Sequence, residues 1–122
     1  MSRLDLICRA LAESRQEEAW TGIRWRVGSK TFAHVVEIDR GWPPAYAAAA
    51  GTDGPATVLT VRAAPEELAA LVAAGPPFFK PVWFDDIVGV NLDDDTDWTE
   101  IEELVVDSYR VVAPRRLVAG LD

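Results

Sequence analysis

A stretch of alternating apolar and basic residues limits the folds open to this chain more than any other feature. In Ile23-Arg24-Trp25-Arg26-Val27 the apolar residues hold the odd positions and the arginines the even ones. Alternation of period two places the apolar side chains on one face of a β-strand and the charged ones on the other. Turn residues 28–30 and a second strand-like segment, 31–38, follow. The sequence therefore predicts a β-hairpin over residues 23–38 with one buried face.

Hydrophobic spacing, turn residues and capping residues place the other elements. Helices are predicted over residues 2–14, 65–74 and 97–113, and strands over residues 57–61, 78–84 and 87–92. Residues 40–56 form a long loop, in which the run from Ala45 to Ala50 can add a helical turn, and residues 114–122 form a C-terminal tail with a short helix.

The order of these elements, α-β(3)-α-β(2)-α, predicts an α+β fold in two layers, an antiparallel sheet with helices on one face. The 122 residues, 49% of them apolar, suit a single domain, residues 1–122, with one hydrophobic core.

The cysteine count and the hydropathy of the chain limit the classes of protein to which it can belong. Cys8 is the only cysteine, which excludes an intramolecular disulfide and a cysteine-based zinc site. No apolar run reaches the ~18 residues of a membrane span, and the N-terminus has no secretory pattern. We expect a soluble, cytoplasmic protein.

Charge is distributed unevenly. The chain carries 12 basic and 20 acidic residues, and the net charge of −8 comes from residues 81–122. A field of this sign repels phosphate at long range. Arg24, Arg26 and Lys30 nevertheless lie on one hairpin and form the one local basic stripe suited to phosphates; the alternative is an ordinary solvated strand face.

Catalytic and metal-binding chemistry finds little support. His34 is the only histidine, and a lone histidine makes neither a metal site nor a catalytic triad. Cys8 falls on the inner face of the first helix, where a thiol acts as a small hydrophobe. The acidic run Asp93 to Asp97 lacks the Gly and Glu of a calcium loop and is interpreted as a helix cap. We expect no enzyme, no cofactor and no metal site.

Five tryptophans are many for this length. Trp25 and Trp98 fall on inward faces and are predicted to be core residues. Trp42 lies in the long loop with Tyr46 nearby, and two interpretations remain open for it. It is a partner-binding anchor, or it caps the core from the loop.

The order and spacing of six segments resemble the MmcQ/YjbR-like family of small bacterial proteins, with coverage of most of the chain outside the 40–56 loop. The segments that carry the resemblance are Cys8 to Leu11, Ile23 to Ala33, Thr57 to Val61, Pro65 to Leu68, Val88 to Leu92 and Glu102 to Ala113.

The resemblance implies the same α-β(3)-α-β(2)-α fold and DNA binding through a "double wing" of β-hairpins, here residues 23–38 and 78–92. Many members carry an Asn-Lys-x-x-Trp stretch. Lys80 and Trp83 fall at its Lys and Trp, whereas Phe79 replaces the Asn and two aspartates, Asp85 and Asp86, follow. An acidic second wing is poorly suited to a phosphate backbone.

Two hypotheses of function follow. In the first, a non-enzymatic protein binds DNA through its wings, with the phosphate- or base-contacting residues Arg24, Arg26, Lys30, Lys80 and Trp83. In the second, a monomeric or homodimeric module binds a protein or a small ligand through Trp42 and Tyr46, without a nucleic-acid role.

Overall fold

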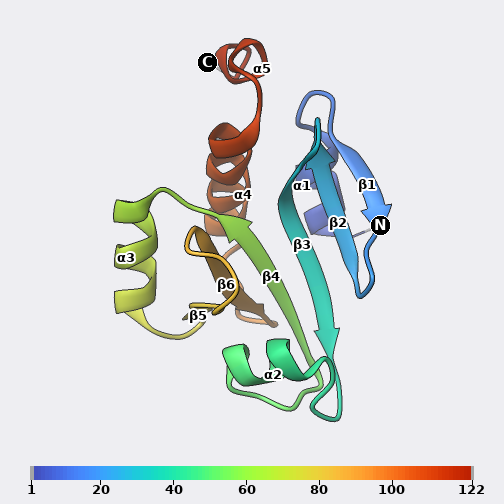
Figure 1. Cartoon of the computed structure of the whole chain (residues 1–122), viewed down its shortest axis with the longest axis vertical. Coiled ribbons are helices and arrows are strands. Elements are labelled where there is room, and N and C mark those ends of the chain that lie inside the picture. Colours follow the sequence, from blue (N-terminus) through green and yellow to red (C-terminus); the bar gives the residue numbers. More distant parts are fainter. Residues whose placement is uncertain (1, 122) are drawn as a thin grey trace.

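The predicted hairpin over residues 23–38 is present, and it lies inside a larger sheet than the sequence predicts. The computed structural model describes residues 2–121. Its strands, neighbours antiparallel in the order β1-β2-β3-β4-β6-β5, form one six-stranded sheet (Figure 1). They are β1 (Arg15–Glu18), β2 (Ile23–Val27), β3 (Lys30–Ile38), β4 (Ala56–Arg62), β5 (Phe78–Phe79) and β6 (Ile87–Leu92).

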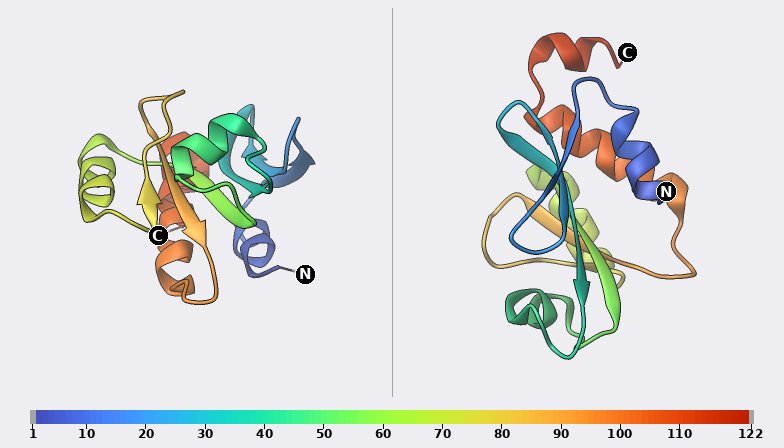
Figure 2. Two further views of the ribbon diagram at one scale, coloured as in Figure 1. Left: turned by 90° about the horizontal axis from the view of Figure 1, so that it is seen from below. Right: turned by 90° about the vertical axis from the view of Figure 1, so that its right-hand side faces the viewer.

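Helices lie on both sides of this sheet. The helices are α1 (Arg3–Arg9), α2 (Pro44–Ala50), α3 (Pro65–Ala74), α4 (Trp98–Val112) and α5 (Arg115–Ala119). Figure 2 shows α1 and α4 against one face, here called the helix face, and the short α2 against the opposite one, here called the outer face. The α+β fold class is confirmed, and α2 is an addition to the predicted arrangement of helices on one face.

The main core fills the space between the helix face and α4. Ile101, Leu104, Val105 and Tyr109 recur at helical spacing on α4 and are buried. Buried strand residues complete this core, among them Trp25, as its alternation predicts. A smaller core on the outer face joins α2 to the strands; its buried members are Val36, Ile38, Tyr46, Ala47 and Val58.

A β-bulge changes which side chains share the outer face. Trp25 pairs with Ala33, whereas Arg26 pairs with Thr31, so Phe32 is the extra residue on β3. Phe32 consequently packs in the main core, its ring 5.4 Å from that of Tyr109. Strict alternation along β3 predicts that Phe32 lies beside His34 on the outer face, and the bulge is the reason that it lies on the helix face instead.

The 40–56 segment is not a plain loop. Pro44 begins α2, and Gly51 ends it with a left-handed backbone (φ 72°) whose N–H bonds to Ala47. The expected helical turn at Ala45 to Ala50 is thus a seven-residue helix.

Three other boundaries differ from expectation. The first helix ends at Arg9 rather than residue 14, and Glu13 takes a positive φ of 59° as the chain turns into β1. Strand β1 was not predicted. The second wing, 78–92, pairs over only two residues of β5, because Pro81 cannot donate to a ladder and residues 80–86 run irregularly.

Replacing Ser108 with alanine should cost roughly 1–3 kcal/mol of unfolding free energy for each main-chain group that it leaves unpaired. The buried Ser108 hydroxyl donates to the Phe32 carbonyl at 2.5 Å and accepts from the Arg62 N–H at 2.8 Å, so it ties α4 to two strands. Urea unfolding of Ser108→Ala beside the exposed control Ser29→Ala measures the cost. Equal midpoints for both variants would contradict this role.

Candidate ligand-binding site

A row of side chains crosses the four central strands of the sheet on its outer face. The strand register places Arg24 opposite His34, His34 opposite Thr60, and Thr60 opposite Gly89. Directly paired residues point to the same face and stand about 5 Å apart. The row therefore runs from a charged end at Arg24, through an imidazole and a hydroxyl, to a glycine covered by the Phe79 ring.

Aromatic side chains from three separate segments wall this row into a cleft of about 260 Å³. Trp20 comes from the β1–β2 turn, Tyr46 from α2, and Trp83 and Phe84 from the 80–86 loop. The rings of Tyr46 and Trp83 lie 4.8 Å apart and are tilted by 56°. Ligand sites typically combine such apolar walls with a few convergent polar groups.

His34 is fixed in one tautomer at the floor of the cleft. Its Nε2 lies 2.8 Å from the Thr21 carbonyl oxygen, which can only accept, so Nε2 carries the proton. Nδ1 is then the acceptor for the Tyr46 hydroxyl, 3.0 Å away. Partial burial and the charge of Arg24 lower the pKa of His34, against the opposing effect of the Thr21 bond. The imidazole is therefore neutral near pH 7, and the Tyr46 oxygen keeps its lone pairs for a ligand.

Acid should destabilise the fold through His34. The unfolded imidazole takes up its proton near pH 6.5, whereas the folded one does so only at lower pH. Below about pH 6.5 the unfolded chain binds more protons, so stability falls as the pH drops through the folded pKa. Urea unfolding at several pH values should show this decline, and His34→Gln should lack that part of it. The same pH profile in both proteins would contradict the assignment.

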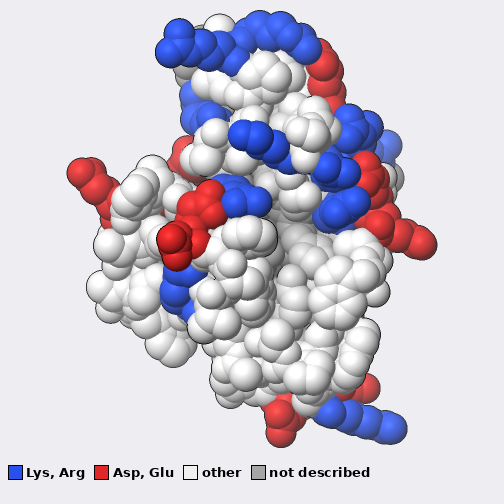
Figure 3. Space-filling model, in the orientation of Figure 1, with Lys and Arg blue, Asp and Glu red and all other residues white. Residues whose placement is uncertain are grey.

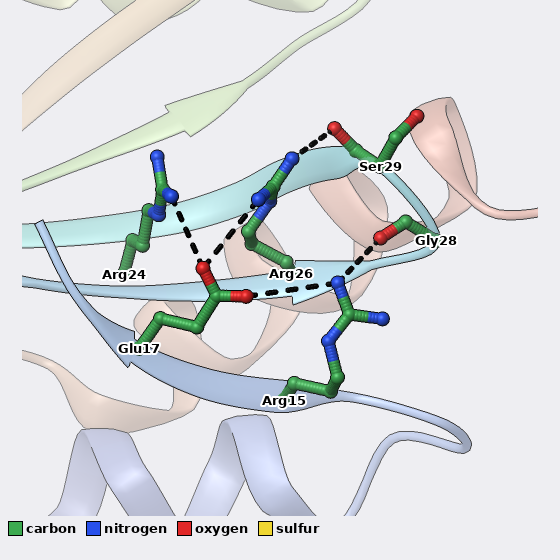
Figure 4. A network of polar contacts seen from close by, with 6 residues as sticks. All are labelled: Arg15, Glu17, Arg24, Arg26, Gly28 and Ser29. Atoms are coloured by element: carbon green, nitrogen blue, oxygen red, sulfur yellow. Dashed lines mark hydrogen bonds and ion pairs between the residues drawn. The ribbon is translucent and has the colours of Figure 1, made fainter.

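An arginine cluster borders the charged end of the cleft (Figure 4). Glu17 on β1 accepts from Arg24 at 3.0 Å and from Arg26 at 3.4 Å, and Arg15 lies 3.7 Å away. The bonds from Arg24 and Arg26, with the Arg24 bond foremost, lower the pKa of Glu17. Figure 3 shows most of the Lys and Arg side chains visible on this face on its upper part, above a broad area with few charges.

The structure brings together three of the site residues predicted from sequence. Arg24, Trp83 and Tyr46 all line the cleft, although they come from the two competing hypotheses. Arg26 lies beside Arg24 on the same face of β2, bonded to Glu17 and to the Ser29 carbonyl.

The other predicted site residues lie apart from the cleft. Lys30 is exposed where β3 begins. Lys80 turns its ammonium onto its own loop, to the carbonyls of Pro81 and Phe84. Trp42 is 55% exposed and packs edge-on against Trp20, with ring centroids 6.2 Å apart.

Sequence reasoning missed four cleft residues and set His34 aside as structural. Thr60 and Arg62 end an apolar strand, and Trp20 and Phe84 lie in turns. Arg62 is bound to Asp86 at 2.8 Å, its guanidinium 5.3 Å from the centre of the Phe84 ring. Thr60, a polar residue flanked by Leu59 and Val61, was the one available signal.

The remaining chemical candidates lie elsewhere. Cys8 is buried on the helix face, where burial raises the pKa of its thiol, and the sheet separates it from His34. Asp97 caps α4, as expected, by accepting from Thr99 and Glu100. Within residues 2–121 no three His, Cys, Asp or Glu side chains gather around a metal-sized space.

No helix in the described part of the chain has the length and apolarity that crossing a bilayer requires.

Two solved structures share this fold. A crystal structure of a Pseudomonas syringae protein aligns with a TM-score of 0.67 and 20% identity, over 91% of this chain and 98% of that one. The crystal structure of a Deinococcus radiodurans protein with a domain described as DUF419 aligns with a TM-score of 0.68 and 19% identity, over 97% of this chain and 84% of that one. No curated protein matches the chain.

The resemblance found in the sequence is confirmed by a family comparison. The model of the family described as YjbR matches residues 9–111, from the end of α1 almost to the end of α4. Because this match spans most of the chain, the protein belongs to the YjbR family.

Proposed function

We propose that this protein is a binding module that holds a small ligand in the outer-face cleft. The observation that carries the proposal is the row from Arg24 through His34 to Thr60, because it places three different polar groups on one floor between aromatic walls. Convergent polar groups at the base of an apolar cleft fix the orientation of a ligand.

Exposure around the cleft supports the same function. Trp20 is 76% exposed and Phe84 is 55% exposed, and both line the cleft. Val82, next to Trp83, is also exposed. Large apolar side chains that gather at one place on a surface favour a binding site there.

The test uses a variant in which a large side chain occupies the cleft. In Thr60→Phe a phenyl ring stands at the centre of the floor, and Thr57→Phe makes the same change on the helix face of β4. A library of small aromatic compounds is screened against both variants and the native chain by ligand-observed NMR. We expect compounds that bind the native chain and Thr57→Phe but not Thr60→Phe. If Thr60→Phe has the native circular dichroism spectrum and still binds the same compounds as the native chain, the proposal is refuted.

Binding of duplex DNA is the second candidate function, and the arginine cluster is what favours it. Arg15, Arg24 and Arg26 surround one carboxylate, and Lys30 adds a further charge at the hairpin turn. Against it, Lys80 is held by its own loop, and Asp85 and Asp86 make the second wing acidic.

Fluorescence anisotropy of a labelled mixed-sequence duplex tests the second candidate. If the hairpin binds phosphates, affinity falls steeply with added salt. Lys30→Glu, a change at an exposed side chain, should weaken binding further. Salt-insensitive binding, or none at low salt, would exclude this mode.

A further inference from the structure

We propose that the ligand of the cleft is an aromatic ring that carries a phosphate group, as in a nucleoside monophosphate. The proposal rests on the proposed function and names the chemistry of its ligand. The ring would lie among the aromatic walls, and the phosphate at the Arg24 end of the row.

The net charge of the arginine cluster favours a ligand group with two negative charges. Three guanidinium groups, those of Arg15, Arg24 and Arg26, face the single carboxylate of Glu17, which leaves a local excess of two positive charges. A phosphate monoester carries a charge of about −1.5 to −2 near pH 7 and so matches this excess. A carboxylate would neutralise only half of it.

Unused hydrogen-bond donors lie at the same end. The Nε atoms of Arg24 and Arg26 are buried and have no hydrogen-bond partner among the described residues. An orphaned buried donor costs free energy, and a guanidinium that turns to present its Nε–H to a ligand acceptor recovers that cost. Arginine binds phosphate oxygens through paired N–H groups, so each orphan lies on a guanidinium suited to that ligand.

The spacing along the row suits a ring joined to an anion. Arg24 and Thr60 lie two strands apart, roughly 10 Å in the hydrogen-bonding direction. The hydroxyls of Tyr46 and Thr60 each donate to His34 and keep lone pairs that can accept from N–H groups at a ring edge. The rings of Trp83 and Tyr46 supply faces on which a base can stack.

Size limits how much of a larger molecule can enter. The volume of about 260 Å³ lies below the roughly 300–1,000 Å³ of sites that enclose drug-sized ligands. One nucleotide is therefore the largest unit that the cleft can enclose. That unit can be a free mononucleotide or an unpaired nucleotide of a strand, and both present the same ring and phosphate.

Calorimetric titration of the full chain with three matched probes tests the proposal. Adenosine 5′-monophosphate carries ring and phosphate, adenosine the ring alone, and ribose 5-phosphate the phosphate alone. We expect the monophosphate to bind at least about ten-fold more tightly than either part, because both ends of the row are then engaged.

Three variants locate the phosphate. Arg24→Gln should remove the preference for the monophosphate over adenosine, whereas Lys30→Gln, the same charge change on the exposed turn, should keep it. Glu17→Gln should tighten monophosphate binding several-fold by releasing the arginines. This last variant predicts a gain, so a folding defect cannot imitate its result.

The outcomes separate this proposal from the one it rests on. The phosphate assignment is overturned if adenosine and its monophosphate bind with equal affinity, or if Glu17→Gln binds the monophosphate more weakly. In either case the proposal that the cleft holds aromatic compounds still stands. Failure of every probe, together with no compound sensitive to Thr60→Phe, overturns both. A deoxyadenosine tetranucleotide distinguishes the two sources. If it displaces the monophosphate and binds more tightly, the ligand is a nucleotide of a strand; if it does not, the ligand is the free nucleotide.

Discussion

Gly22→Ala is expected to lower the free energy of unfolding by about 3 kcal/mol or more, because it combines backbone strain with a clash. Gly22 has a φ of +74°, and a Cβ there would lie 2.0 Å from the main-chain oxygen of Val35. That oxygen belongs to β3, in the middle of the sheet, and cannot move aside without breaking the ladder.

Gly28 provides the matched control. Its φ is +59°, yet a Cβ there would meet no atom within 4 Å. Gly28→Ala therefore carries the strain alone, roughly 1–2 kcal/mol. Urea unfolding of the two variants measures the difference, and equal losses would contradict the close approach of the β1–β2 turn to β3. The same turn carries Thr21, whose carbonyl holds His34, so Gly22→Ala should also disturb the cleft.

Trp83→Ala is expected to weaken the binding of adenosine 5′-monophosphate by roughly ten-fold or more, since stacking a base on an aromatic ring is worth about 1–3 kcal/mol. Trp83 lines the cleft and packs on Tyr46 at 4.8 Å. Calorimetric titration measures the loss. Trp83→Phe keeps a ring in place and should retain most of the affinity.

Trp42→Ala is the control for this prediction and decides an interpretation that the sequence left open. Trp42 is exposed and packs against Trp20, at the rim rather than on the lining. Its removal should change monophosphate affinity less than about two-fold, because the stacking surface stays. If Trp42→Ala abolished binding while Trp83→Ala did not, the anchor would lie at Trp42, just before α2, and the cleft would be the wrong site.

Local patterns were enough to predict the main elements. The alternation in residues 23–27 and the helical spacing in α4 each predict which face of the element is buried, because burial repeats with the period of the element. The family resemblance rested on these same segments. Strand β1 was not predicted because Arg15-Gln16-Glu17-Glu18 is wholly polar and shows no alternation of apolar residues. A polar sequence suits an edge strand, and this segment is a strand only because it pairs with β2.

The candidate site depends on register, which no local pattern contains. Arg24, His34 and Thr60 are neighbours because three strands pair in one register, and a one-residue slip would turn a strand's side chains to the other face. The bulge at Phe32 is such a local shift. Tyr46 and Trp83 were both singled out in the sequence, but as members of different sites, and only the packing of α2 against the 80–86 loop brings them together.

The most direct test of the cleft as the ligand site is a titration of the ¹⁵N-labelled chain with adenosine 5′-monophosphate, followed by amide chemical-shift mapping. We expect the largest shifts along the row, at Arg24, His34, Thr60 and Gly89, and we expect these shifts to saturate together. Shifts confined to the helix face or to the acidic residues 93–97, or the absence of any saturable shift, would contradict it.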